Sequence, residues 1–139
     1  MEKYIWTKNQ SVGVEEIDIQ HHHFFDITND LISKSEQENF SAWDLVLIVT
    51  YLNNYATIHL LTEENIFKRY NYFDAEEHIA KHDAYREKMK EFMARVELEE
   101  LGSKKLALEI AEFAGNWLMN HIMVEDKKYV GFMIENGIK

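Results

Sequence analysis

The sequence contains no cysteine, no proline and only five glycines. Without cysteine the chain cannot form disulfides, zinc ribbons, iron–sulfur clusters or thiol nucleophiles, so any bound metal must use nitrogen and oxygen ligands. Because proline breaks helices and glycine weakens them, their scarcity leaves long segments free to be helical.

Long apolar runs and an excess of positive charge are also missing. No segment approaches the roughly 18 apolar residues of a membrane span, and the first residues lack the apolar core of a secretory signal, so we expect a cytoplasmic protein. The formal net charge is −10. Such a surface repels nucleic acid and anionic lipid, which bind basic patches, so neither is an expected partner.

The 139 residues suit one domain. We expect an N-terminal arm over 1–17, extended and packed on the rest through Trp6, and a bundle over about 18–130. Apolar residues recur at three- and four-residue intervals in four segments, which indicates helices. We place an N-cap at Ser41 and a capping-box start at Asp74. Since the connections are short, we predict an all-α, antiparallel up-and-down four-helix bundle. The helices span about 18–37, 42–69, 74–96 and 104–131.

Polar residues interrupt the inward apolar stripes of these helices. Burying a carboxylate or imidazole is costly unless it gains a hydrogen bond, a counter-charge or a metal. Two pairs lie four residues apart, which places both members on one face of a helix. An up-and-down bundle brings all these positions to one end of the molecule, together with a histidine near the start of the first helix. The residues are His21, His59, Glu63, His78, His82 and His121.

The alternative is that each histidine is a hydrogen-bonded core residue, which requires a separate partner for every one. Asp126 lies five residues after His121, about 140° around an ideal helix, so we expect a distortion near 122–126 if both reach one site. Glu64 is expected at the surface, and His22 and His23 at the periphery. An aromatic set is expected in the core: Phe24, Phe25, Trp43, Tyr55, Phe67 and Trp117.

Imidazoles and carboxylates without thiolate suit iron, manganese or zinc. Five histidines and two carboxylates exceed what one octahedral ion takes, whereas two ions bridged by Glu63, Asp126 and a solvent-derived oxo or hydroxo group can use all seven. Three histidines then complete six-coordination at one ion. The other two leave the second ion five-coordinate, with a position open for a small diatomic ligand.

Four segments of the chain closely resemble the ligand-bearing motifs of hemerythrins, including single-domain bacterial forms. They are IDIQHHHFF (17–25), HLLTEE (59–64), HIAKH (78–82) and WLMNHIMVED (117–126). The resemblance implies a non-haem di-iron centre, with His78, His82 and His121 on one iron and His21 and His59 on the other. It also implies reversible dioxygen binding for transport, storage or delivery. We expect no enzymatic activity beyond a weak oxidase or peroxidase side activity.

Apolar walls are expected around the open position, formed by Phe25, Tyr55, Leu118, Ile122 and Val124. Three alternatives remain open. The site could process peroxide or nitric oxide as an enzyme, or hold zinc or manganese. It could also act as an oxygen or nitric oxide sensor or an iron store that signals to a separate partner, which a large exposed apolar patch would favour.

Overall fold

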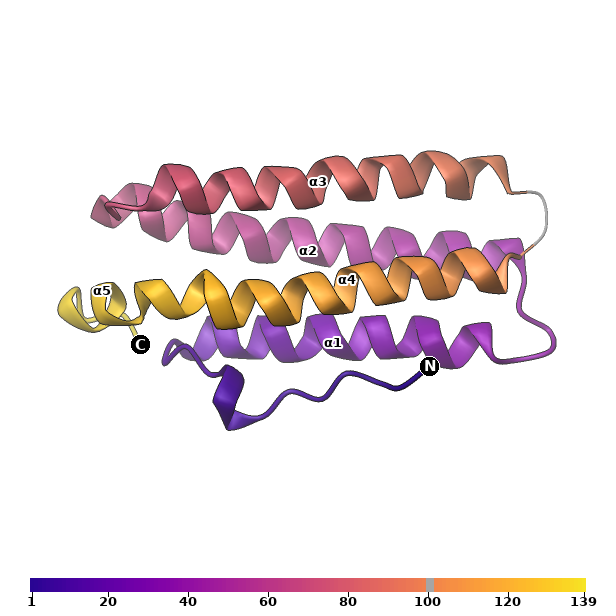
Figure 1. Cartoon of the computed structure of the whole chain (residues 1–139), viewed down its shortest axis with the longest axis horizontal. Helices are drawn as coiled ribbons and strands as arrows, with labels where there is room; N and C mark the ends of the chain where they lie inside the picture. Colours follow the sequence, from indigo (N-terminus) through magenta and orange to yellow (C-terminus); the bar gives the residue numbers. More distant parts are fainter. Residues whose placement is uncertain (100–101) are drawn as a thin grey trace.

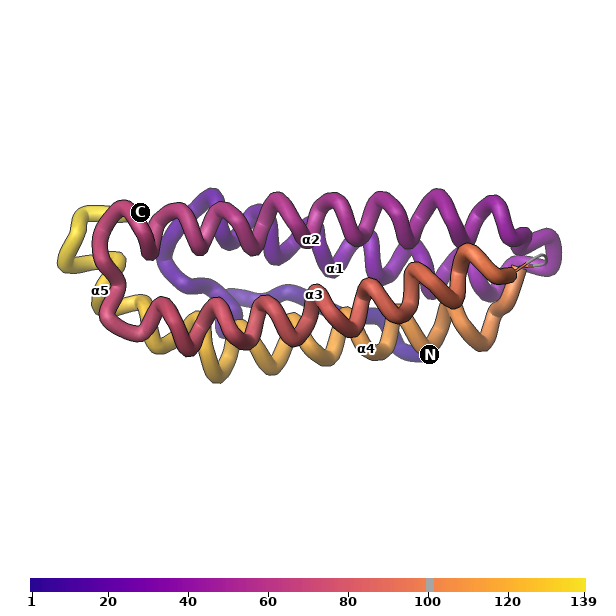
Figure 2. The backbone as a smooth tube through the Cα atoms, turned by 90° about the horizontal axis from the view of Figure 1, so that it is seen from above, coloured from indigo at the N-terminus to yellow at the C-terminus, as the bar shows by residue number. Residues whose placement is uncertain are grey.

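The computed structural model describes residues 1–99 and 102–139, and within them four long helices form an antiparallel up-and-down bundle without strands (Figure 1). The predicted fold class is thus confirmed. Each long helix packs on two neighbours, α1 on α2 and α4, and α3 on α2 and α4. Figure 2 shows the α1–α2 pair on one side of the bundle and the α3–α4 pair on the other. The long helices are α1 (Glu15–Ser35), α2 (Ala42–Tyr70), α3 (Ala75–Leu98) and α4 (Lys104–Val124).

The N-terminal ends of α2 and α3 differ in how they are capped. Ser41 and Asp44 form a reciprocal capping box at α2, in which the Ser41 Oγ accepts from the Asp44 N–H at 3.2 Å. The N-cap predicted at Ser41 is therefore confirmed. Asp74 precedes α3 but makes no side-chain bond to it, so the capping box predicted there is wrong.

The N-terminal arm is shorter and less extended than predicted. It contains the 3-10 helix η1 (Lys8–Gln10), capped by Thr7, and α1 begins at Glu15 instead of Asp18. The reason is local, because the Asp18 carboxylate accepts the Val12 N–H at 2.9 Å and so holds the turn that precedes α1.

Tyr4 attaches the arm to the bundle. Its N–H donates to Asn29 Oδ1 at 2.8 Å, and its carbonyl accepts from Asn29 Nδ2 at 2.8 Å. The Tyr4 ring stacks on Phe25 and lies against Gly115 of α4, where a Cβ atom would overlap it. Trp6 also packs on the core and stacks on His22, as predicted, but Tyr4 makes the larger number of polar contacts.

The fourth helix ends early and the chain changes direction. α4 stops at Val124 and is followed by the 3-10 helix η2 (Asp126–Tyr129) and the short helix α5 (Val130–Glu135). The distortion predicted near 122–126 is therefore confirmed. Figure 1 shows α5 at the end of the bundle where α2 turns into α3.

Candidate metal centre

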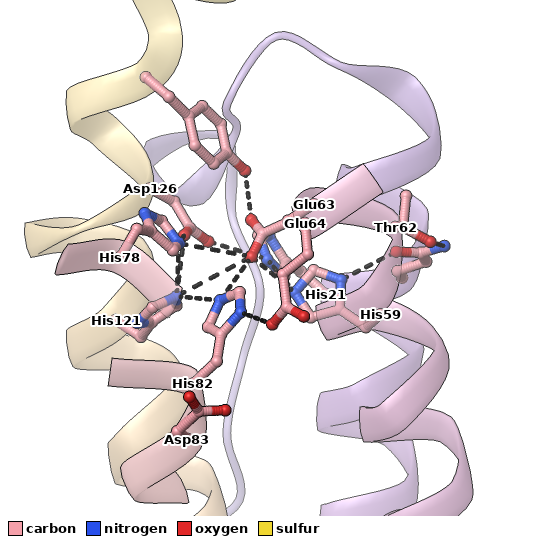
Figure 3. A network of polar contacts seen from close by, with 12 residues as sticks. His21, His59, Thr62, Glu63, Glu64, His78, His82, Asp83, His121 and Asp126 are labelled. Carbon is pink, nitrogen blue, oxygen red and sulfur yellow. Dashed lines mark hydrogen bonds and ion pairs between the residues drawn. The ribbon is translucent and has the colours of Figure 1, made fainter. Parts of the chain in front are cut away.

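Five imidazoles and two carboxylates converge at the end of the bundle where α2 ends and α3 begins (Figure 3). Each of the seven is at most 2% exposed. They come from all four long helices and η2, so only the assembled bundle brings them together. The residues are His21 on α1, His59 and Glu63 on α2, His78 and His82 on α3, His121 on α4 and Asp126 on η2.

The cluster consists of two donor groups that share Glu63. One contains Glu63, His78, His82 and His121, and the other contains His21, His59, Glu63 and Asp126; within each group the ligand atoms lie within 4.8 Å of one another. Asp126 also faces both groups, because its Oδ2 lies 3.1 Å from His21 Nε2 and its Oδ1 lies 3.1 Å from the Nε2 atoms of His78 and His121. Two carboxylates therefore stand between two sets of histidines.

The imidazole nitrogens face one another in a way that hydrogen bonds alone do not satisfy. His121 Nε2 lies 3.0 Å from His78 Nε2 and 3.1 Å from His82 Nε2, and His21 Nε2 lies 3.0 Å from His59 Nε2. Glu63 Oε1 and both Asp126 oxygens are buried without a hydrogen-bond partner. The metal-free alternative needs a separate partner for the Nε2 atom of each histidine, whereas these atoms share the same two carboxylates and face one another. Convergent nitrogen and oxygen lone pairs fit cations instead.

The carboxylates hold negative charge in this interior. Burial raises the pKa of Glu63, but the nearby His59 and the other histidines that face this carboxylate outweigh it and hold the pKa well below the ordinary value. The pKa of Asp126 is likewise lowered, because His121 and His21 outweigh burial and the charge of Glu63. Both groups are therefore anionic at neutral pH, as metal ligands must be.

The histidines of the cluster differ in pKa. Burial lowers the pKa of His121, but Asp126 and Glu63 outweigh it and raise the pKa to about 10. Burial and the neighbouring His21 lower the pKa of His59 to about 3. Without a cation, the cluster thus keeps His121 protonated beside the carboxylates and His59 neutral.

Polar side chains contact two of the imidazole rings at Nδ1, the nitrogen that does not face the other ligands. The Nδ1 atom of His59 lies 2.8 Å from Gln20 Oε1, and that of His82 lies 2.6 Å from Glu64 Oε2. Arg86 holds Glu64 in turn at 2.8 Å. Glu64 was predicted at the surface, and this is wrong: its side chain is only 16% exposed. It follows Glu63 by one position, which turns it toward α3, where His82 and Arg86 offer N–H groups.

Tyr129 is a member of the site that the sequence interpretation missed. It is fully buried in η2, and its hydroxyl donates to Glu63 Oε2 at 2.6 Å. Its ring stacks on His78, with centroids 5.7 Å apart. The available signal was its position three residues after Asp126, since three residues complete one turn of a 3-10 helix and place both side chains on one face.

The five residues predicted to form the apolar wall differ in burial. Phe25, Leu118 and Ile122 are buried, whereas Tyr55 is half-buried and packs on the ring of His23. Val124 is 47% exposed, so its assignment to the wall is wrong: two residues beyond Ile122 it points about 200° away around the helix.

Of the other predicted positions, Trp43 was expected in the core and is 68% exposed on the outer side of α2, so that prediction is wrong. His22 is exposed and His23 contacts Tyr51 outside the cluster. The peripheral positions predicted for these two histidines are confirmed.

Known proteins of the same architecture are similar to this chain in sequence and structure. The family model of the hemerythrin HHE cation binding domain matches residues 12–133. A bacteriohemerythrin of Clostridium acetobutylicum is 24% identical over 91% of this chain and 98% of its own length. Hemerythrin subunit alpha of Lingula anatina is 28% identical over 94% of this chain and 95% of its own length. The crystal structure of a wild-type hemerythrin superposes with a TM-score of 0.82 at 25% identity, covering 92% of this chain and 95% of that one.

The family model thus covers the bundle, the four histidine-bearing helices and the 3-10 helix that carries Asp126. The relatives match over nearly their whole lengths. On this evidence the chain belongs to the hemerythrin family.

Proposed function

We propose that this protein binds dioxygen reversibly at a pair of iron ions, as a carrier, store or delivery protein. The observation that carries the proposal is that two buried donor groups share Glu63, while Asp126 directs one oxygen toward each. One ion cannot use all seven groups, whereas two ions bridged by both carboxylates and an oxo or hydroxo group can. The proposed ligands are His21, His59, Glu63, His78, His82, His121 and Asp126.

The two donor groups contain different numbers of histidines, which supports different roles for the two ions. His78, His82 and His121 gather in one group, and His21 and His59 in the other. The second group therefore offers one histidine fewer, which would leave space for a small ligand at an ion held there. A bound pair of irons supplies the electrons that reversible dioxygen binding requires.

The protein's own residues keep water out of the site and orient the proposed ligands. Phe25, Leu118 and Ile122 are buried apolar side chains on the ligand-bearing helices α1 and α4, where they would help to keep water out of the site. Tyr129 and Glu64 fix the orientation of Glu63 and His82. A site with many neutral histidines and few anionic ligands favours lower oxidation states, which suits release of the ligand without net chemistry.

The primary test is the metal content and the visible spectrum of the protein through repeated cycles of reduction and oxygenation. We expect two irons per chain and an oxygen-dependent absorption band that returns to its starting form in each cycle. A zinc-loaded, colourless protein would contradict the proposal. A protein that ends oxidised, with peroxide or nitric oxide consumed, would support the enzyme alternative instead.

The histidines provide a matched pair of variants. His82→Ala removes a proposed ligand and should reduce iron content and abolish the band. His22→Ala removes an exposed imidazole that stacks on Trp6 outside the cluster, so it should leave both unchanged. Equal losses in the two variants would contradict the assignment of the site. The cytoplasmic location stays a prediction.

A further inference from the structure

An apolar stripe runs along the outer face of α2, opposite the metal ligands. Its members are 45% to 68% exposed. Their spacing of three, four and seven residues places them within about 80° of one another around the helix, on the side away from His59 and Glu63. The α2 stripe consists of Trp43, Leu47, Tyr51, Ile58 and Leu61.

The α2 stripe follows a long uncharged stretch of the helix that begins just after Asp44. Residues 45–62 include no Asp, Glu, Lys or Arg, although the chain carries a net charge of −10. The outer face of α3, in contrast, carries many exposed charged residues, such as Lys81, Asp83, Lys88 and Glu91. Elsewhere in the described chain, exposed large apolar residues are scattered over the N-terminal arm and the other helices. The outer face of α2 therefore lacks the charges that normally keep a bundle surface solvated.

The area of the stripe suits an interface of modest size. With about 200 Å² for a full side chain, the five residues leave on the order of 500 Å² of apolar surface in water. Patches of this size on a monomer commonly mark interaction sites. Two copies packed stripe to stripe bury on the order of 1000 Å² from these residues alone, and flanking threonines and asparagines bring the total into the range of specific interfaces. In Figure 2, α2 forms one long edge of the bundle with no other segment outside it.

We infer that the α2 stripe is covered by the α2 stripe of a second copy of this chain, with the two helices antiparallel about a two-fold axis near Asn54. Two chains of net charge −10 repel each other least across an uncharged face. The ends of α2 differ in sign, with Asp44 at its start and exposed Lys68 and Arg69 at its end. An antiparallel pair brings each basic end beside the acidic end of the other copy and opposes the two helix dipoles.

A lipid bilayer fits this face less well. The helix has the length and hydropathy of a membrane span, with 33% of the apolar window buried. To cross a bilayer, however, α2 would have to carry His59 and Glu63 out of the protein core into hydrocarbon, which is costly. Binding flat on an anionic membrane is opposed by the net charge of the chain.

The test is the molar mass of the purified, metal-loaded protein by sedimentation equilibrium over a wide concentration range. We expect a reversible monomer–dimer equilibrium, with the dissociation constant raised at least tenfold by Leu47→Glu or Ile58→Glu. Ile134→Glu is the matched control, since Ile134 is 73% exposed on α5, and it should leave the equilibrium unchanged. Circular dichroism checks that each variant keeps its helical content.

Crosslinking tests the orientation, because a chain without cysteine allows single-cysteine variants without background. Asn54→Cys should form a disulfide-linked dimer on oxidation, since the two-fold axis brings this position against itself. Leu47→Cys should not, because it lies about 10 Å along the helix from the axis, too far from its own copy for a disulfide. Ala94→Cys, exposed on α3, gives the background rate of random collision.

Several outcomes would overturn the inference. A protein that stays monomeric at all concentrations has no second copy on this face, and binding to phosphatidylcholine or phosphatidylglycerol vesicles would then identify a lipid surface instead. A dimer unaffected by the α2 substitutions uses another face. Rapid self-crosslinking of Leu47→Cys would mean that the two helices are parallel.

Discussion

The Tyr129 hydroxyl and the Glu63 carboxylate are joined by a buried 2.6 Å hydrogen bond between η2 and α2. Burial raises the pKa of Tyr129 well above its ordinary value, and the negative charges of Asp126 and Glu63 raise it further. The hydroxyl therefore stays protonated and donates. By holding Oε2, it leaves Oε1 directed at His82, 3.0 Å away. This bond fixes the orientation of the carboxylate that both donor groups share.

Tyr129→Phe should weaken metal binding by about 10- to 100-fold, the usual cost of removing a group that orients a ligand. The measurement is metal retention in competition with a chelator. Tyr85→Phe is the control, since Tyr85 is equally buried but its hydroxyl has no hydrogen-bond partner. Removing that unpaired hydroxyl should leave metal retention unchanged and not lower stability. Equal metal retention in the two variants would show that the Tyr129 bond does not orient Glu63.

Glu64→Gln should also weaken metal binding by about one order of magnitude, because a neutral amide is a poorer acceptor for the His82 Nδ1–H and makes the ring a weaker donor. Asp83→Asn is the matched control. Asp83 contacts the same Arg86 at 3.0 Å but touches no ligand of the cluster. If both substitutions reduce metal affinity alike, the effect comes from Arg86 and not from the His82–Glu64 bond.

The sequence was sufficient to predict the bundle and the cluster, because paired positions such as His78 and His82 report one helix face directly. It did not reveal the role of Tyr129, which depends on how η2 turns after α4. It also did not show that Trp43 lies on the exposed outer side of α2 instead of in the core. Apolar residues lie on both the inner and outer faces of α2, and no charge marks the outer one. Periodicity therefore showed a helix but not which apolar side faced the core.

Glu64 illustrates the same limit on a smaller scale. A charged residue beside an inward one is normally solvated, and helical geometry alone turns it away from the core. What holds it is the pairing with His82 and Arg86 on the adjacent helix. Such cross-helix contacts depend on the rotation of α2 relative to α3, which the sequence pattern does not specify.

The stability of the metal-free protein should pass through a maximum near pH 6.5. The folded protein raises the pKa of His121 to about 10 from an ordinary 6.5, so its contribution is fully present below 6.5 and is lost as pH rises toward 10. His59 has its pKa lowered to about 3. The unfolded chain therefore takes up a proton that the folded chain refuses, and stability falls as pH drops from 6.5 toward 3.

Urea unfolding of chelator-treated protein between pH 4 and 10 measures this profile. His121→Gln should flatten the alkaline side, and His59→Gln should flatten the acid side. Stability that rises steadily to pH 10 would contradict the charge assigned to His121.

Removing the metal should destabilise the fold strongly, because a cation bound only by the folded state adds stability that depends on its concentration. At a thousandfold excess over Kd, linkage gives about 4 kcal/mol, which corresponds to more than about 10 °C in Tm for a domain of this size. Calorimetry with and without chelator measures the shift. In His78→Ala the shift should shrink, whereas in His23→Ala, outside the cluster, it should persist. A chelator without effect on the wild-type Tm would show that no metal stabilises the cluster.

Gly115→Ala should detach the N-terminal arm without unfolding the bundle. A Cβ at this position overlaps the Tyr4 ring. The N-terminal arm is displaced more easily than α4, because α4 is packed into the bundle. Alanine improves the helix by about 1 kcal/mol, which offsets part of the lost Tyr4 contacts, so global stability should change little. Trypsin cleavage at Lys8 and exchange of the Tyr4 amide should accelerate several-fold. Gly131→Ala is the control, because a Cβ there meets nothing within 4 Å. Unchanged protection of Tyr4 in Gly115→Ala would mean that the ring is not what seats the arm on α4.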